Sequence, residues 1–205
     1  RTLGTDAEAA FDRQESIDCA AVKPQITWGT SPQDVIAIDD PVPDPARESD
    51  ATRRQAIERA LSYIRVTPGS PLIGTRIDYA FIGSCTNGRY ADLAAAARLL
   101  RGRRVAPGVR AVAVPGSMQV KRAAESAGLD RIFREAGFEW HNPGCSMCVA
   151  ANGDVVPPGK RCISTTNRNF ENRQGPGSFT HLASPESVAA AAIAGRIADA
   201  RALMD

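Results

Sequence analysis

Short apolar segments, each followed by a polar loop and then a helical segment, recur along most of this chain. Residues 78–83 form one apolar segment, and the alanine-rich stretch 90–100 after it has the composition of a helix. The same order returns at 109–114, which precedes two predicted helices at 118–127 and 129–136. Strands that alternate with helices predict an α/β fold with a mainly parallel sheet covered on both faces, a three-layer α/β/α arrangement.

Three polar loops follow predicted strands directly. The loop SCTNGR comes after the first apolar segment, NPGCSMC comes after the short strand FEW, and TTNRNF comes after the strand KRCIS. In parallel sheets, ligands bind beyond the carboxyl ends of the strands. We therefore expect a ligand site where these three loops meet.

The remaining segments predict the domain organisation. Because the chain does not begin with methionine, we interpret it as a piece of a longer polypeptide, in which residues 1–45 are the remnant of a preceding domain and a proline-rich linker with one edge strand. Residues 46–205 are the predicted α/β domain. It begins with an amphipathic helix at 51–66 and ends with a long helix from Ser184 to about Leu203.

Composition and charge argue against several classes of partner. The 205 residues carry 25 basic and 23 acidic side chains, a net charge of +2, without the basic stripe of a nucleic-acid-binding protein. No window approaches 18 consecutive apolar residues, and the N-terminus lacks the apolar core of a signal peptide, so we expect a cytoplasmic protein with no membrane partner. In that compartment, the five cysteines are thiols or metal ligands rather than disulfides.

Cys145 and Cys148 form a C-x-x-C motif, and Cys85 lies in the equivalent loop after another strand. By itself, C-x-x-C is compatible with zinc, with an iron–sulfur cluster and with dithiol redox chemistry. A cubane cluster held by three cysteines leaves one iron open, and an open iron is a Lewis acid suited to dehydration. Cys19, in the predicted remnant, and Cys162, in an apolar strand, are not expected to be ligands.

The loop after KRCIS carries groups that suit an anion site. Arg168 and Arg173 lie there with Asn167, and guanidinium groups bind carboxylates through two parallel hydrogen bonds. His141 and His181 are the only histidines. We interpret His141 as a loop group near the C-x-x-C and His181 as a residue that satisfies local backbone, not as catalytic bases.

The segments FIGSCTNGR, NPGCSMC and STTNRNFENRQG closely resemble the three signature segments of the aconitase family. Further matches at ITWGTSPQDVI, AGFEW and THLASPE make the chain similar to one branch of it, the large subunits of 3-isopropylmalate dehydratases. The resemblance extends over essentially the whole chain and implies the fold of the iron–sulfur domain of that family. The chain departs from the family at Glu171-Asn172, where small residues are usual, commonly with glycine second.

The resemblance also implies a reaction. Enzymes of this branch interconvert 2-isopropylmalate and 3-isopropylmalate, 2-hydroxy dicarboxylic acids of leucine biosynthesis, by removing water and adding it back in the opposite sense. Sibling hydro-lyases, such as homoaconitase or a methylmalate-type dehydratase, share the same cluster loops and stay open as alternatives. A metal-dependent binding module is a further alternative, and its RNA-binding form is disfavoured by the near-neutral charge.

The site residues implied by the resemblance fall into two sets. The substrate-binding set would bind carboxylate groups near a [4Fe–4S] cluster, and the metal set would hold that cluster, which we expect an aerobically prepared chain to lose readily. The catalytic base would come from a separate small subunit, so we expect the chain to be inactive alone and assign it no catalytic residue. The substrate-binding residues are Asn167, Arg168 and Arg173, and the metal ligands are Cys85, Cys145 and Cys148.

Overall fold

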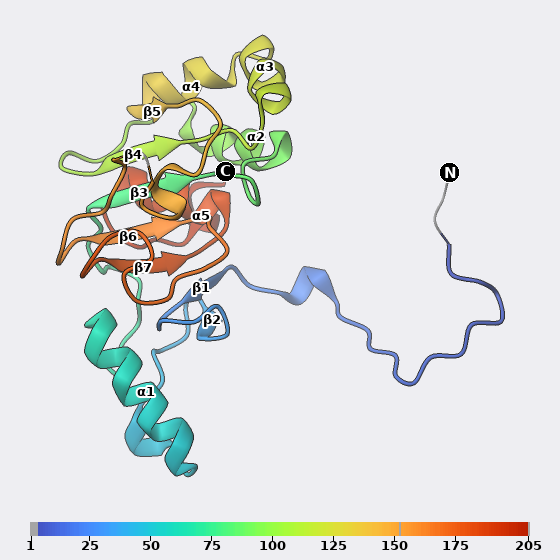
Figure 1. Ribbon diagram of the computed structural model, residues 1–205, viewed down its shortest axis with the longest axis vertical. Coiled ribbons are helices and arrows are strands. Elements are labelled where there is room, and N and C mark those ends of the chain that lie inside the picture. The colour runs from blue at the N-terminus through green and yellow to red at the C-terminus, as the bar shows by residue number, and fades with distance from the viewer. Residues whose placement is uncertain (1–3, 152, 205) are drawn as a thin grey trace.

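The computed structural model describes residues 4–151 and 153–204 and is organised around a five-stranded sheet (Figure 1). The strand order is β5-β4-β3-β6-β7, and each adjacent pair is parallel. The α/β fold class with a mainly parallel sheet is therefore confirmed. The strands are β3 (Tyr79–Ile82), β4 (Arg110–Ala113), β5 (Phe138–Trp140), β6 (Arg161–Ser164) and β7 (Phe179–Leu182).

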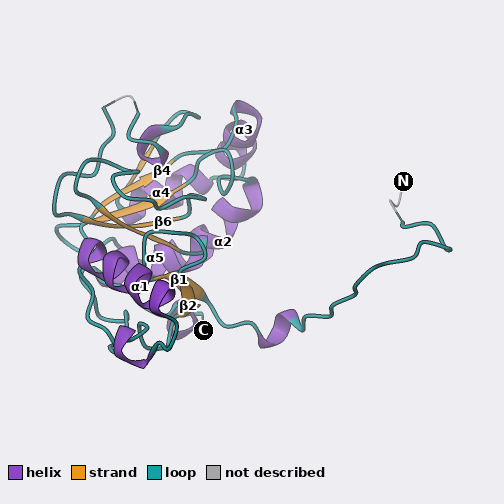
Figure 2. Cartoon of the chain, turned by 60° about the horizontal axis from the view of Figure 1, so that its bottom comes forward, coloured by secondary structure: helices purple, strands orange, loops and turns teal. Residues whose placement is uncertain are grey.

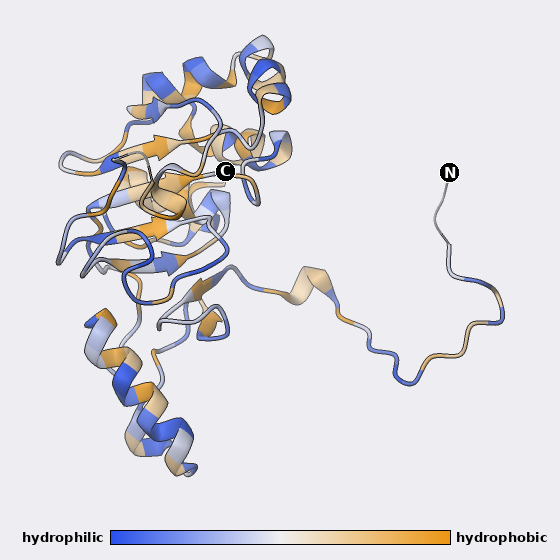
Figure 3. Ribbon diagram, viewed as in Figure 1, coloured by the Kyte–Doolittle hydropathy of each residue, from blue (hydrophilic) through white to orange (hydrophobic). Residues whose placement is uncertain are grey.

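One face of the sheet is covered by helices. Successive side chains of a strand point to opposite faces, so Ala80 and Ile82 of β3 share one buried core with Ile163 of β6. Leu93 and Val188, on two of the covering helices, belong to the same core. The central strands are coloured as hydrophobic in Figure 3. The helices are α2 (Tyr90–Leu100), α3 (Met118–Ser126), α4 (Leu129–Ala136) and α5 (Pro185–Ala194).

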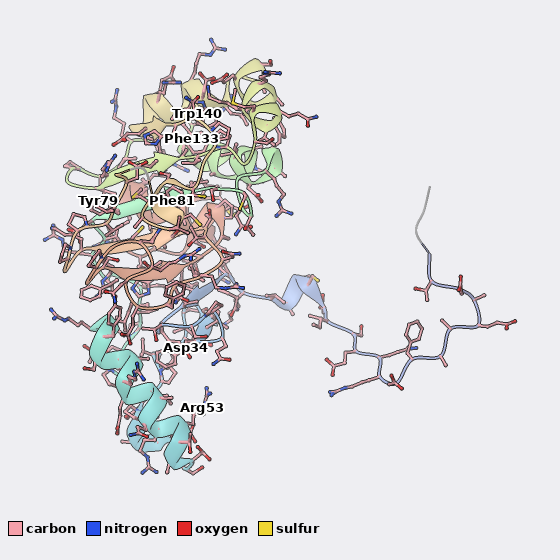
Figure 4. The ribbon with its side chains drawn as sticks, in the orientation of Figure 1. Asp34, Arg53, Tyr79, Phe81, Phe133 and Trp140 are labelled. Carbon is pink, nitrogen blue, oxygen red and sulfur yellow. The ribbon has the colours of Figure 1, made fainter. Side chains whose placement is uncertain are left out.

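Aromatic packing fixes β5 at the edge of the sheet. The ring of Phe133, on α4, lies edge-to-face with that of Phe138 at 5.3 Å between centroids and 5.4 Å from that of Trp140. Figure 4 labels Phe133 and Trp140 in this cluster. The strand that leads into the C-x-x-C loop is therefore held by three large rings, which gives that loop a rigid starting point.

The opposite face is covered by a loop. Phe81, Val112 and Cys162 point to that side and form a second buried cluster with Met147 and Val156. Within the described part of the chain, no α-helix contributes to this cluster. The loop contains the short 3-10 helix η3 (Ser146–Cys148), so the C-x-x-C motif is itself part of the packing on this face.

An antiparallel hairpin of β1 (Gln25–Thr27) and β2 (Val35–Ala37) precedes the sheet. The predicted edge strand is thus β2, and it pairs with β1 rather than with the main sheet. Ile26, Trp28 and Ile38 are buried in the same core as the sheet. The domain boundary near residue 45 stays a prediction, although these buried residues lie before it. Residues 4–23 are exposed and extend away from the folded body (Figures 1 and 2).

The chain contains α1 (Ala51–Ile64), as predicted, between the hairpin and the sheet, and two further 3-10 helices, η1 (Cys19–Ala21) and η2 (Pro45–Arg47). In Figure 1, α1 lies at the end of the sheet below β7. Among the helices of residues 4–151 and 153–204, none is long and apolar enough to cross a membrane.

The predicted length of the last helix is wrong. Helix α5 ends at Ala194, because Gly195 adopts a left-handed backbone with φ of 68°. The chain then turns toward the segment before β3, where the Ile77 amide donates to the Gly195 carbonyl at 3.2 Å and Arg76 forms an antiparallel bridge with Arg196. A separate 3-10 helix, η4 (Ala200–Leu203), follows. Glycine inside the predicted helix is the sequence signal for this stop.

A buried arginine–histidine pair joins the sheet to α1 and β1. Arg161 donates through Nη1 to His181 Nε2 at 2.7 Å and through Nη2 to the Ile64 carbonyl, at the end of α1, at 2.9 Å. The second ring nitrogen of His181, Nδ1, donates to the Thr27 carbonyl at 2.7 Å. Burial, and then the neighbouring Arg161 charge, lower the pKa of His181 to about 3. These contacts support the interpretation of His181 as a structural residue.

We expect the free energy of unfolding to fall as the pH is lowered below about 6.5, the pKa of histidine in an unfolded chain. The unfolded state then binds a proton that folded His181, with its pKa of about 3, does not take up until much lower pH. The contribution of neutral His181 to the free energy of unfolding is fully present above about pH 6.5, and about 2 kcal/mol of it is lost at about pH 5. Urea unfolding at both pH values measures it. His181→Gln keeps a donor and an acceptor but cannot bind a proton, so its free energy of unfolding should fall less between these two pH values. A fall as large as that of the wild-type chain would show that His181 does not cause the pH dependence.

Candidate metal centre

The three polar loops leave the sheet at its carboxyl edge. Strands β4 and β5 lie on one side of β3, and β6 and β7 lie on the other. The chain connections therefore diverge between β3 and β6, which is the switch point where open α/β sheets bind ligands. The loop of Cys85 follows β3, and the loop of Arg168 and Arg173 follows β6, so both start at this point.

Hydrogen bonds join these two loops. The Gly83 amide donates to Thr165 Oγ1 at 2.9 Å, and the same hydroxyl donates to the Gly83 carbonyl at 2.8 Å. The side-chain amide of Asn87 donates to the Thr165 carbonyl. Cys85 lies between these anchored residues and is exposed. The loop after β3 thus presents an accessible thiol from a fixed base.

Cys145 and Cys148 lie on the turn around η3, after β5. Cys145 is exposed, whereas Cys148 is only 8% exposed, because Met147 between them is inserted into the core of the second face. The Cys148 amide donates to the Cys145 carbonyl at 2.9 Å. Ser146 Oγ donates to Asp154 Oδ2 at 2.8 Å. The motif therefore presents one exposed and one buried thiol from a single turn.

Arg173 is the predicted substrate-binding residue that contacts this turn. Its Nε donates to the Cys148 carbonyl at 2.9 Å, and its Nη2 lies 4.0 Å from Cys148 Sγ. The guanidinium carbon lies 5.1 Å from the centroid of the Phe170 ring. Within the described part of the chain, Nη1 makes no hydrogen bond, so donors remain for an anion beside the thiol.

Asn167 and Arg168 make no hydrogen bond to the C-x-x-C turn in residues 4–151 and 153–204. Both side chains are exposed, and Arg168 Nη1 donates to the Asn167 carbonyl at 2.8 Å. The next asparagine, Asn169, is buried and donates to the Gly29 carbonyl at 2.8 Å. Of the three predicted substrate-binding residues, the structure brings only Arg173 to Cys148.

Asn172 shows how the chain accommodates its departure from the family pattern. Its φ is 67°, in the left-handed region that glycine and asparagine tolerate best. Its Oδ1 accepts from the Gly177 amide at 2.7 Å, and its own amide donates to Tyr63 Oη at 2.7 Å. Asn172 therefore adopts the left-handed backbone expected of glycine at this position, and its bond to Tyr63 holds the loop that carries Arg173 to α1.

The three predicted metal ligands lie in two different loops, those after β3 and β5. In the part of the chain that the structure describes, no three His, Cys, Asp or Glu side chains are placed to hold a metal ion. The loops of Cys85 and Cys145 share the carboxyl edge but are separated by β4. The three-cysteine set stays a prediction. Cys19 is exposed in the N-terminal segment, and burial raises the pKa of the Cys162 thiol in β6.

Asp154 and Gln174 were not identified from the sequence. Gln174 is fully buried and donates to the Met147 carbonyl at 3.0 Å, while its Oε1 accepts from Thr180 Oγ1 at 2.9 Å. Asp154 accepts from Ser146, as described above. Both residues hold the C-x-x-C turn through contacts that depend on the path of the loops, so periodicity gives no signal for them. The only sequence signal for Gln174 is its position directly after Arg173.

Comparison with known proteins decides the family. The model of the aconitase family, described as aconitate hydratase, matches residues 1–195. The chain belongs to the aconitase family. A relative within it is the 3-isopropylmalate dehydratase large subunit 1 of Bradyrhizobium diazoefficiens, 60% identical over 203 residues, which are 99% of this chain and 43% of that protein.

A second aconitase-family relative is the 3-isopropylmalate dehydratase large subunit of Cupriavidus necator. It is 59% identical over 201 residues, which are 98% of this chain and 75% of that protein. The chain therefore spans less than half of the first relative and three quarters of the second. Family membership agrees with the resemblance of the three signature loops.

Proposed function

We propose that this chain is part of a hydro-lyase that interconverts 2-isopropylmalate and 3-isopropylmalate in leucine biosynthesis. The proposal is carried by the Arg173 guanidinium beside Cys148, with its Nε on the Cys148 carbonyl at 2.9 Å. A carboxylate-binding group next to a thiol at the switch point of the sheet suits a hydroxy acid that is dehydrated at a metal. The names of the two relatives, both dehydratase large subunits, support the same reaction.

We further propose that Cys85, Cys145 and Cys148 hold a [4Fe–4S] cluster. The donor chemistry fits, because three thiols suit iron–sulfur ligation, whereas structural zinc takes four nitrogen or sulfur ligands. Two of these thiols are exposed, and all three lie in loops at one edge of the sheet. When bound, such a cluster supplies an iron open to the hydroxyl and carboxylate oxygens of a substrate.

The residues of this chain would bind and orient the substrate. Arg173 is proposed to bind one carboxylate through its free nitrogens, while its Nε stays on the Cys148 carbonyl. Arg168 is exposed and is proposed to bind the second carboxylate, with Asn167 beside it. Both guanidinium groups remain charged at neutral pH, so the pair suits a substrate that carries two carboxylates.

We assign neither histidine of the chain the role of catalytic base. His181 is buried, and both of its ring nitrogens are hydrogen-bonded. His141 Nε2 lies 3.0 Å from Glu139 Oε2, next to the C-x-x-C loop. We therefore propose that a separate small subunit, implied by the name "large subunit" of the relatives, supplies the base. No nucleic acid and no membrane take part, and we place the enzyme in the cytoplasm.

We expect the chain alone, with its cluster rebuilt under anaerobic conditions, to show no dehydration of 3-isopropylmalate. Proton abstraction from carbon needs a positioned base, which contributes about 10²–10⁴ in rate. A continuous assay of the chain, compared with a complete large subunit plus small subunit, measures this. Turnover by the chain at a rate near that of the complete enzyme would place the base in this chain. No turnover by the complete enzyme would contradict the proposed reaction.

A further inference from the structure

A serine and an aspartate close the loop that carries the C-x-x-C motif. Ser146, between the two cysteines, is 5% exposed, and its Oγ donates to Asp154 Oδ2 at 2.8 Å. The Asp154 amide donates to the Ala151 carbonyl at 3.1 Å, and the Ala151 amide donates to the Ser146 carbonyl at 3.0 Å. The two ends of the loop are thus joined by both side-chain and backbone hydrogen bonds.

Ser146 needs this support because its backbone is left-handed. Its φ is 46°, a conformation that a residue with a Cβ keeps only when its surroundings hold it. Met147, next to it, is fully buried and fixes the turn from the apolar side. In the part of the chain that the structure describes, the bond to Asp154 is the only hydrogen bond of the Ser146 hydroxyl. Its loss would let the turn relax.

Asp154 is oriented by Arg110 of β4 and by His141, which directly follows β5. Its Oδ1 lies 3.6 Å from Arg110 Nη2, and its Oδ2 lies 3.7 Å from His141 Nδ1. Arg110, on β4, is fixed in turn by Glu139 of β5, with Nε to Oε1 at 2.7 Å and Nη2 to Oε2 at 2.9 Å. Because β4 and β5 are paired strands of the five-stranded sheet, Asp154 ties the turn to that sheet.

We propose that Asp154, acting through Ser146, is a positioning residue of the thiol pair, in addition to the contacts of Arg173 and Gln174 with the same turn. It keeps Cys148 buried and Cys145 exposed before any metal group binds. Ligands that are fixed in advance lose less conformational freedom when a metal centre forms, which raises its affinity. The identity of the metal centre rests on the proposed function, whereas the positioning of the two thiols does not.

Site-resolved thiol labelling of the metal-free chain tests this positioning. A short pulse of maleimide followed by peptide mass spectrometry gives a separate rate for each cysteine. In the wild-type chain, Cys145 should react quickly and Cys148 slowly, as their exposures require. In Asp154→Ala and in Ser146→Ala, we expect the rate at Cys148 to rise about tenfold, because one hydrogen bond to a charged group is lost. Asp154→Asn keeps an acceptor oxygen and should raise the rate less.

Two controls separate local loosening from general unfolding. Cys162 is fully buried in β6, so its labelling rate reports global opening and should stay at the wild-type value. Asp78→Ala is the matched variant, because Asp78 also accepts two hydrogen bonds, from Lys160 and Arg161, but lies just before β3 at the opposite edge of the sheet. Asp78→Ala should leave the labelling rate of Cys148 at the wild-type value. Unchanged Cys148 rates in both loop variants, or equal acceleration at Cys148 and Cys162, would overturn the inference.

Anaerobic loading with iron and sulfide distinguishes this inference from the proposed function. After gel filtration, Asp154→Ala and Ser146→Ala should retain several-fold less iron than the wild-type chain and Asp78→Ala. If the wild-type chain retains no iron, the proposed cluster is wrong, and the labelling rates alone decide the positioning role. If the loop variants retain as much iron as the wild-type chain, Asp154 does not position the thiols for a metal.

Discussion

Replacing Arg173 by lysine in the complete enzyme should lower kcat/KM for the proposed substrate, 3-isopropylmalate, by about ten- to a hundredfold. The arginine donates through Nε to the Cys148 carbonyl and is proposed to bind a carboxylate with its remaining nitrogens. Lysine keeps the positive charge but has a single nitrogen, so it cannot hold the carbonyl and grip a carboxylate through two parallel bonds at once. Most of the loss should appear in KM if the carboxylate is bound equally in the ground state and the transition state.

Steady-state kinetics of Arg173→Lys and Arg173→Ala, beside a control at Arg122, check this expectation. Arg122 is an exposed residue of α3, and Arg122→Lys should retain the wild-type kcat/KM. Wild-type kcat/KM in Arg173→Lys would exclude a bidentate role for this arginine. Thermal unfolding of each variant shows whether a loss of activity comes from a loss of folded protein.

The sequence predicted those elements whose side chains follow a simple period. The predicted helix at 129–136 agrees with α4, because Leu129, Phe133 and Ala136 are buried at helical spacing and Gly137 ends it. β7 was missed, since its sequence FTHL contains two polar residues. Both are buried, and His181 is accommodated there through its bond to Arg161, twenty residues earlier. Such pairing between distant residues leaves no periodic signal.

In the candidate site too, the sequence predicts the motifs but not the contacts between distant segments. Motifs that lie close together in the sequence identified the C-x-x-C and Arg173, which the structure brings together at Cys148. The contacts that hold these residues, from Asp154 to Ser146 and from Tyr63 to the Asn172 amide, depend on how separate segments pass one another. Tyr63 lies on α1, far from the motif in sequence, so only the folded chain reveals its contact.

The largest effect is expected on iron content. Serine in place of Cys85, Cys145 or Cys148 removes a thiolate, and each variant should lose most of the iron bound by the wild-type chain after anaerobic reconstitution. Cys19→Ser and Cys162→Ala are the controls, because Cys19 lies in the exposed N-terminal segment and Cys162 is buried within β6. Both should keep the wild-type iron content.

Iron and acid-labile sulfide measured together on the anaerobically reconstituted wild-type chain test the central claim most directly. A cluster held by the three loop cysteines predicts about four iron and about four sulfide per chain, with a brown colour that is lost in Cys148→Ser. Bound zinc without sulfide, no retained metal, or a full complement of iron in Cys148→Ser would contradict it.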